Sequence, residues 1–307
     1  MGIRRKISNT IDSVVEYYLE NYKKMVFIPI ALIIFFGAFI GYYYHTHGQF
    51  FKEDISLAGG TSLTVTTNTA INPNHIAGTI GSILSQPVTV TVIRAPFSNS
   101  ISGYSITTVS GVNTTALQNA ASTALGMPIG SNDSSITFVS ASLAQSQLYS
   151  SFILLGAAFV LVAIVSLFYF RNVWQAFSNV ISIISDIINI VGVLDIIGFS
   201  FSTASIAGIL MIMGYSADRN IILATNILKR KEATMKYRLV HTIRTSLTMD
   251  AAALATFLVL FFGTSNSTIQ SIAIILIIGV IFDDFTVWIL NGSTQLFGLK
   301  YKEAEKS

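Results

Sequence analysis

Six long apolar runs dominate the pattern of hydrophobic and polar positions along this chain. The first covers Met25–Tyr44, and five more follow a polar stretch of about a hundred residues. The five later runs cover approximately Phe152–Phe170, Ala176–Ile197, Ser202–Leu228, Ser246–Phe262 and Thr268–Leu290. A helix that crosses a bilayer needs about 17–25 mostly apolar residues, and each run approaches or reaches that length. We therefore predict an α-helical membrane protein with six transmembrane helices.

The polar stretch between the first and second runs has strand and helix patterns of its own. Alternation of apolar and polar residues is typical of a half-buried strand, and an asparagine cap followed by proline opens a helix. Asn72-Pro73 and Asn113 each precede a helical pattern. We predict strands at 61–67, 87–94, 104–110 and 135–140, and helices at about 73–85 and 113–125. The order βαββαβ predicts an α+β domain of the ferredoxin-like type between helices 1 and 2.

Residues 1–24 form an amphipathic pattern before the first apolar run. Its apolar positions recur at helical spacing, and acidic side chains occupy the opposite face. The apolar positions are Ile11, Val14, Val15, Tyr18, Leu19 and Tyr22. Two interpretations remain open, a helix on the inner membrane surface and a helix that packs on the protein's own cytoplasmic loops.

Composition excludes several classes of protein. Hydrophobic residues make up 52% of the 307 residues and charged residues 11%, whereas soluble domains carry about 25% charged residues. Neither a soluble enzyme nor a disordered chain fits these values. The chain has no cysteine, which excludes disulfides, iron–sulfur clusters and thiol nucleophiles. Four histidines without a suitable spacing make a metal site improbable, so we expect no metal, no cofactor and no catalytic residues.

The basic residues set the predicted orientation. Fifteen of the 18 lie in segments on one side of the six runs, and only Lys52 and Arg94 lie in the polar stretch. Because basic residues favour the cytoplasmic side, we expect both termini in the cytoplasm and the polar stretch outside. The predicted division is a cytoplasmic segment 1–24, helix 1 at 25–45, an external domain 46–150, a five-helix domain 151–297 and a cytoplasmic tail 298–307.

Acidic residues within the apolar runs are the most informative chemistry. An acid at mid-membrane costs about 2.5–3.5 kcal/mol on insertion scales, so it needs a use or a partner. Asp186 shares a helix face with Asn189, and Asp218 and Asp283 sit within two later runs. We predict that these four residues line a common interior as a proton or cation relay. The competing interpretation is structural ion pairing, in which Arg219 or Arg244 neutralises an acid. Asp250, near one end of its run, is a further pairing candidate.

Local motifs in order along the chain resemble the SecF branch, archaeal type, of the SecD/SecF protein-export family, in the resistance–nodulation–division superfamily. Gly59-Gly60 is similar to the family's double glycine, and Ser185-Asp186-Ile187 to its acid site. Gly214-Tyr215-Ser216 is similar to its G-Y-S signature. The chain departs from the family where Arg219-Asn220 replaces an acid after that signature.

The resemblance implies an auxiliary subunit of the Sec export machinery that uses the proton or sodium gradient. It also implies a SecD-like membrane subunit, the Sec channel and an unfolded translocating polypeptide as partners, within the lipid bilayer of the cell membrane and without nucleic acid. A structural subunit without ion coupling and a small-molecule or lipid exporter of the same superfamily remain alternatives. An intramembrane aspartyl protease is disfavoured because the chain contains no Tyr-Asp pair.

Overall fold

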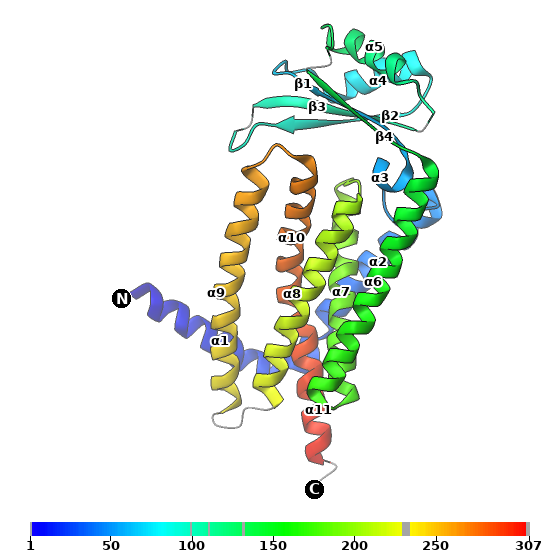
Figure 1. Cartoon of the computed structure of the whole chain (residues 1–307). Coiled ribbons are helices and arrows are strands. Elements are labelled where there is room, and N and C mark those ends of the chain that lie inside the picture. The colour runs from blue at the N-terminus through cyan, green and yellow to red at the C-terminus, as the bar shows by residue number, and fades with distance from the viewer. Residues whose placement is uncertain (1, 99, 110, 131–132, 229–233, 305–307) are drawn as a thin grey trace.

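The structure is mostly helical, with a small four-stranded sheet above one end of a helix bundle (Figure 1). This computed structural model describes residues 2–98, 100–109, 111–130, 133–228 and 234–304. Three basic residues of the predicted cytoplasmic loop lie outside these ranges, as does the end of the predicted tail. They are Lys229, Arg230 and Lys231 in the loop and residues 305–307 in the tail.

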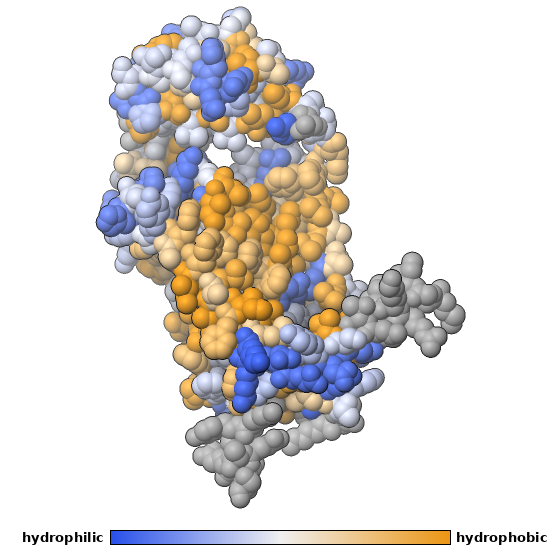
Figure 2. Space-filling view, turned by 180° about the vertical axis from the view of Figure 1, so that it is seen from behind, coloured by the Kyte–Doolittle hydropathy of each residue, from blue (hydrophilic) through white to orange (hydrophobic). Residues whose placement is uncertain are grey.

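Six helical segments of the described chain are long and apolar enough to cross a membrane. They are α2 (Phe27–His47), α6 (Ala141–Phe170), α7 (Val173–Ile196), α8 (Thr203–Leu228), α9 (Met235–Phe262) and one continuous segment of α10 (Ser267–Phe285), η1 (Thr286–Asn291) and α11 (Gly292–Ala304). Each overlaps one of the six predicted apolar runs. Figure 2 shows the apolar belt that these helices present between two more polar ends.

The two ends of the bundle differ in what covers them. We call the end that carries the turns α7–α8 and α9–α10 the sheet end, because the sheet lies above it (Figure 1). The opposite end, which carries the turn between α6 and α7, is the far end.

Two of the helices begin well before the apolar run predicted for them. Helix α6 begins at Ala141, where the Ser140 hydroxyl accepts a hydrogen bond from the Leu143 amide at 3.3 Å. Helix α9 begins at Met235, and the Thr234 hydroxyl accepts from the Tyr237 amide at 3.3 Å. Both extensions are polar, so an apolar run does not include them. In α9 the extension places Asp250 near the middle of the helix.

The small domain follows the strand and helix order predicted from the sequence. Its elements are β1 (Gly60–Thr66), α4 (Pro73–Leu84), β2 (Val88–Arg94), β3 (Ile101–Thr108), α5 (Thr114–Leu125) and β4 (Ser134–Val139). The sheet order is β2-β3-β1-β4, and every neighbouring pair is antiparallel. The two helices cover the sheet face that points away from the bundle (Figure 1).

Alternating side chains of the central strands build the core of the small domain. Leu63 of β1 pairs with Ile106 of β3, and both are fully buried beneath α4 and α5. Tyr104 is buried too, and its hydroxyl donates to the carbonyls of the loop after β1. The predicted caps are confirmed, since the side chains of Asn72 and Asn113 accept hydrogen bonds from the first turns of α4 and α5.

Two separate contacts hold the small domain on the sheet end of the bundle. In the first, the Asp54 amide donates to the Phe201 carbonyl at 2.7 Å, and the Phe201 amide donates to the Lys52 carbonyl at 2.7 Å. In the second, the Phe97 amide of the β2–β3 loop donates to the Phe262 carbonyl at 2.6 Å. The first contact reaches the α7–α8 turn and the second the α9–α10 turn, on opposite sides of the domain (Figure 1).

The double glycine lies where the first contact meets the sheet. The short helix α3 (Ile55–Ala58) leads into Gly59 and Gly60, whose φ angles are +82° and +149°. A Cβ atom on Gly60 would lie 2.3 Å from the Thr108 carbonyl oxygen, so a side chain has no room there. Glycine is required because the chain turns sharply while its backbone passes close to β3.

Helix α1 (Gly2–Met25) packs on the protein's own helices through one face. Val15, Tyr18 and Tyr22 are buried in a cluster with residues of α8, α9 and α11. The Tyr18 and Ser293 hydroxyls are hydrogen-bonded at 3.2 Å, and burial raises the pKa of Tyr18. Other apolar side chains of α1, such as Tyr17, remain exposed. The interpretation of a helix packed on the protein is thus supported, and the exposed face leaves contact with a membrane surface open.

The first contact also carries a titratable side chain, the carboxyl group of Asp54. Burial raises the pKa of the Asp54 carboxyl above its ordinary value of 3.8. A raised pKa in the folded state stabilises the fold only while the carboxyl is protonated, so this contribution is lost as pH rises through the folded-state pKa. We expect Asp54→Asn to raise stability at pH 7 by less than about 1 kcal/mol and to flatten the pH dependence just above 3.8, in thermal unfolding followed in detergent. The exposed Glu20→Gln in α1 is the control, and an unchanged pH profile of Asp54→Asn would contradict the expectation.

Candidate functional site

A fully buried carboxyl group lies in the middle of the bundle. Asp186 of α7 is 0% exposed and accepts hydrogen bonds from two hydroxyls on two other helical segments. The Ser216 hydroxyl of α8 donates to Oδ2 at 2.7 Å, and the Thr286 hydroxyl of η1 donates to Oδ1. Three elements distant in sequence therefore converge on one acid.

A buried guanidinium group lies beside this acid and binds three others. Arg219 Nη1 of α8 lies 3.1 Å from Asp250 Oδ1 of α9 and 2.7 Å from Asp283 Oδ2 of α10, and Nη2 binds Asp284. The Tyr215 hydroxyl also donates to Asp250 Oδ1. The Arg219 side chain is 2% exposed, so its charge is balanced by these carboxylates and not by water.

Asp186 differs from the other three acids in its charged neighbour, which is the carboxyl group of Asp283, whereas the others bind Arg219. Asp283 interacts electrostatically with Asp186, whereas Asp283 itself also binds Arg219. Among the described residues, Asp283 Oδ1 has no hydrogen-bond partner. The cluster thus places three carboxyl groups around one guanidinium, and a fourth, that of Asp186, is held by hydroxyls next to Asp283. Because the carboxyl groups outnumber the guanidinium group, the cluster favours the uptake of additional positive charge, such as a proton.

The structure brings together only some of the predicted relay residues. Asp186 and Asp283 meet as expected, and Asn189 is buried one turn from Asp186. Asp218 does not join them and is exposed on the other side of α8, together with Gly214 of the family motif. The predicted common interior for Asp218 is therefore wrong. Successive residues of a helix lie about 100° apart, so the burial of Arg219 turns Asp218 outward.

The pairing candidates also differ from expectation. Asp250 is 2% exposed in the middle of α9, because that helix begins eleven residues before the predicted run. Arg244 lies 3.7 Å from Asp12 of α1, and both side chains are nearly half exposed. The ion pair shown for Arg244 therefore belongs to the contact with α1. Arg219 is the base that lies among the buried acids.

A chain of buried amides and hydroxyls extends from Asp186 toward the far end. Asn220 Nδ2 donates to the Ser216 hydroxyl at 3.2 Å, and Asn291 donates to Asn220 Oδ1. Asn291 Nδ2 also donates to Asn179 Oδ1 at 3.1 Å. Asn179 was not among the predicted site residues, although it stands seven residues before Asp186 and so on the same face of α7.

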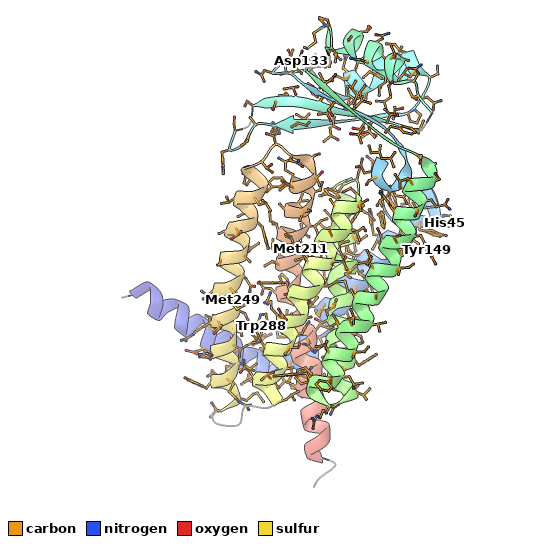
Figure 3. All side chains as sticks on the ribbon, viewed as in Figure 1. His45, Asp133, Tyr149, Met211, Met249 and Trp288 are labelled. Atoms are coloured by element: carbon orange, nitrogen blue, oxygen red, sulfur yellow. The ribbon has the colours of Figure 1, made fainter. Side chains whose placement is uncertain are left out.

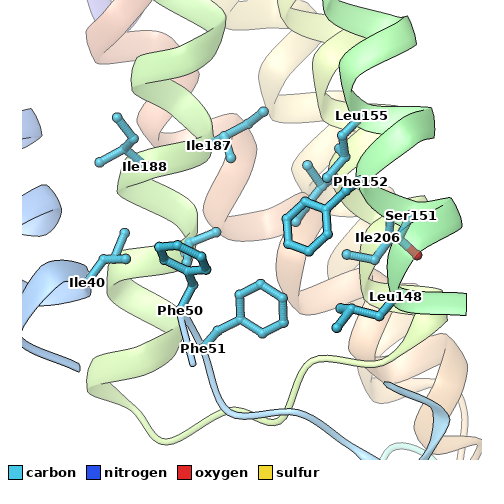
Figure 4. A pocket seen from close by; sticks show the side chains of 12 residues that line it. Ile40, Phe50, Phe51, Leu148, Ser151, Phe152, Leu155, Ile187, Ile188 and Ile206 are labelled. Carbon is cyan, nitrogen blue, oxygen red and sulfur yellow. The ribbon is translucent and has the colours of Figure 1, made fainter. Parts of the chain in front are cut away.

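The sheet side of Asp186 is apolar by contrast. A cavity of about 180 Å³ opens there among α2, α6, α7, α8 and the segment after α2 (Figure 4). Ser151 is the polar residue of its lining. Its other lining residues are Ile40, Phe50, Phe51, Leu148, Phe152, Leu155, Ile187, Ile188, Val191, Ile206 and Ile209.

Titratable side chains of the small domain lie far from this cluster. Figure 3 places Asp133 at the top of the domain and His45 at the sheet end, whereas Met249 and Trp288 lie in the far half of the bundle. Within the described part of the chain, no three His, Asp or Glu side chains are grouped as metal ligands. The chemistry of the molecule is therefore concentrated in the cluster around Asp186 and Arg219.

Comparison with known sequences identifies what the chain is similar to. The family described as "Protein export membrane protein SecD/SecF, C-terminal" matches residues 118–298. The protein-export membrane protein SecF of Pyrococcus furiosus is 27% identical over 98% of this chain and 99% of that protein. The SecF of Methanocaldococcus jannaschii is also 27% identical, over 94% of this chain and 99% of that protein.

Solved structures show a similar fold. The crystal structure of SecDF, a translocon-associated membrane protein from Thermus thermophilus, superposes with a TM-score of 0.70 at 14% identity. The alignment covers 92% of this chain and 38% of that one. A second SecDF crystal structure, in a super-membrane-facing form, gives a TM-score of 0.56 at 16% identity, over 94% of this chain and 40% of that one. This chain thus spans about two fifths of the solved SecDF chains.

Proposed function

The chain belongs to the SecD/SecF family of protein-export membrane proteins, and from this premise we propose that it is an accessory subunit of the Sec machinery that uses an ion gradient. We infer the ion coupling from the surroundings of Asp186. A fully buried carboxyl held by two hydroxyls and faced by a second carboxyl has no charged base among the groups that bind it. Such a group suits reversible loading with a proton.

In this proposal Asp186 and Asp283 hold an exchangeable proton between them. Two carboxylates in contact repel each other strongly in a water-poor interior, so one of them is expected to be neutral. Arg219 then fixes Asp283 and the neighbouring acids Asp250 and Asp284 in place. One charge that crosses 100 mV supplies about 2.3 kcal/mol. By the tenfold-per-1.4 kcal/mol relation, this biases two conformations by about 50-fold.

The exposed side of α8 supports a membrane partner. Ala207, Met211, Gly214 and Asp218 recur at helical spacing and are exposed, Met211 by 54%. Small residues allow another helix to approach closely, and an acid that faces lipid is costly. We therefore assign Asp218 to this partner-binding face of α8 and not to the relay. The partner proposed from the family is a SecD-like subunit, which would act with it at the Sec channel on an unfolded polypeptide.

We further propose a cell-membrane location with the far end in the cytoplasm. Basic residues gather where α1 ends and where α9 begins, next to the far end, which agrees with the preference of bases for the cytoplasmic side. They are Lys23, Lys24, Lys236, Arg238 and Arg244. The small domain then lies outside. Its element order and its sheet order β2-β3-β1-β4 support a ferredoxin-like assignment. With α6 beginning at Ala141, we place the end of the external domain at Ser140.

A structural subunit without ion coupling is the second candidate function, and the Arg219 ion pairs favour it. In that case the acids would only hold α8, α9 and α10 together. The two functions differ in their dependence on the gradient, which export assays resolve.

The test compares protein export in energised membrane vesicles with and without this chain. We expect the chain to stimulate export while a gradient is present, and an ionophore that collapses the gradient should remove the stimulation. Separate ionophores for protons and sodium identify the ion. Stimulation that survives collapse of both gradients would refute ion coupling and leave the structural function.

A further inference from the structure

We propose that the π-helical turn η1 connects Asp186 to the far end of the bundle, and that Asn291 is the positioning residue of this connection. The inference rests on the proposed function and deepens it by naming the side from which Asp186 exchanges protons. It concerns residues Thr286–Asn291, between α10 and α11 in the last membrane-spanning segment.

The two ends of η1 carry the two contacts that matter. Thr286, its first residue, donates directly to Asp186, and Asn291, its last residue, lies at the centre of the amide chain. A π-helix forms hydrogen bonds between residues five apart, so positions 286 and 291 fall on nearly the same face. In an α-helix they would be about 140° apart. The wider turn therefore directs both side chains toward α7 and α8.

The Asn291 carboxamide has all four of its hydrogen bonds. Its Oδ1 accepts from the Ser178 hydroxyl at 2.6 Å and from Gln295 Nε2 at 3.1 Å. Its Nδ2 donates to Asn179 and Asn220. A carboxamide offers two donors and two lone pairs, so this group is saturated and has one orientation. An apolar side chain at this position would remove the partner of Asn179 Oδ1, Asn220 Oδ1 and Gln295 Nε2, while Ser178 would keep Thr294.

Two routes of hydrogen bonds therefore join Asp186 to η1. One is the direct bond from Thr286, and the other passes from Asn291 through Asn220 and Ser216. Beyond Asn291 the chain continues to Ser178, which is hydrogen-bonded to Thr294. The half-exposed Trp174 indole donates to the Thr294 carbonyl at 3.0 Å. The side-chain hydrogen bonds thus lead as far as the Thr294 hydroxyl, on a partly exposed residue of the far end.

On the sheet side of Asp186 the same path is closed. A Cβ on Gly192 would lie 2.5 Å from the Phe36 ring, so the ring of α2 fills the notch that this glycine leaves. Leu194, Ile209 and Ile275 lie in the same buried apolar cluster. Asn189 Oδ1 is buried without a hydrogen-bond partner among the described residues. Hydrogen-bonded polar groups therefore lead from Asp186 toward the far end, whereas toward the sheet end the polar groups described on this face of α7 stop at Asn189 and the apolar cluster begins.

The charged groups around Asp186 belong to the cluster already described. Asp283 of α10 faces Asp186, and Asp283 in turn binds Arg219 of α8, which also binds Asp284 of α10 and Asp250 of α9, the acid that accepts from Tyr215. The connecting residues of η1, α7 and α8 are serine, threonine and asparagine, none of which titrates near neutral pH. Replacing them therefore changes the connection without adding or removing a charge.

The test follows the protonation of Asp186 in sealed vesicles that contain the full chain and its partner. Dicyclohexylcarbodiimide reacts with protonated carboxyls in apolar surroundings, and the mass of the Asp186 peptide reports the reaction. A pH jump is applied on one side of the membrane at a time. We expect labelling to follow the pH at the far end. Asn291→Leu should slow this response about tenfold or more, because the orphaned buried groups disconnect the route.

Matched variants keep the test decisive. Ile289→Leu, in the same turn, should respond like the parent chain. If Asn291→Leu does not fold, Thr286→Val removes one hydroxyl and should slow the response, and Thr286→Ser should restore it. The inference is overturned if labelling follows the pH at the sheet end. It is also overturned if folded Asn291→Leu responds at the rate of the parent chain. Labelling that follows the far-end pH while export ignores the gradient supports the inference and refutes the proposed function.

Discussion

Replacing Asp186 by asparagine is expected to abolish the gradient-dependent stimulation of export while the protein still folds and binds its partner. Asparagine is close to aspartate in shape and still accepts the hydrogen bond from Ser216, but it cannot take up or release a proton. Loss of a bias worth about 2.3 kcal/mol per 100 mV should reduce the stimulation by tenfold or more. The measurement is export in energised vesicles, with the amount of assembled complex determined in parallel.

Asp133→Asn is the matched control for the loss of an acid, because Asp133 lies in the small domain far from the cluster (Figure 3). It should leave both export and assembly unchanged. If Asp186→Asn exports with full gradient dependence, Asp186 is not the loading residue. If it instead fails to assemble, the acid acts as a structural group, and the second candidate function gains support.

Replacing Arg219 by methionine is expected to destabilise the membrane-spanning bundle by about 3–5 kcal/mol, the range seen when one partner of a buried ion pair is removed. Methionine fills similar space but leaves the buried Asp250 and Asp283 and the partly buried Asp284 without their shared cation. Arg219→Lys should be less damaging but not neutral, because an ammonium group lacks the planar fork that reaches several carboxylates at once. Thermal unfolding in detergent, followed by size-exclusion chromatography, measures the change.

Lys24→Ala serves as the control for the loss of a basic side chain. Lys24 is exposed at the end of α1, where substitutions usually change stability by less than about 0.5 kcal/mol. Unfolding of Arg219→Met at the temperature of the parent chain would show that the three acids are neutral or hydrated, and it would remove Arg219 as the organiser of the cluster.

Sequence patterns predicted the elements well because each has a local cause. The apolar runs required by a bilayer identified the six candidate membrane spans of the described chain, and Asn72 and Asn113 marked the starts of α4 and α5. Polar extensions were missed in α6 and α9, since a search for apolar residues ends where the helix leaves the hydrocarbon. The error at Asp250 followed directly from the second of these.

The candidate site was predicted only in part, for two physical reasons. Lipid-facing and buried positions of a membrane helix are both apolar, so the pattern did not tell which side of α8 holds the interior, and Asp218 was assigned to the wrong one. The π-helical turn breaks the 3.6-residue period, so the shared face of Thr286 and Asn291 could not be found from spacing. Asp186 and Asp283 were found because a buried acid is costly wherever its helix faces.

The two attachments of the small domain determine how it can move. The segment around Asp54 is fixed to the α7–α8 turn, and Phe97 is fixed to the α9–α10 turn on the other side. Strand β4 also continues directly into α6 at Ser140, on the side of the first contact. A shift of the α9–α10 turn along the helix axes would therefore lift or lower the Phe97 side of the sheet and tilt the domain about its opposite side.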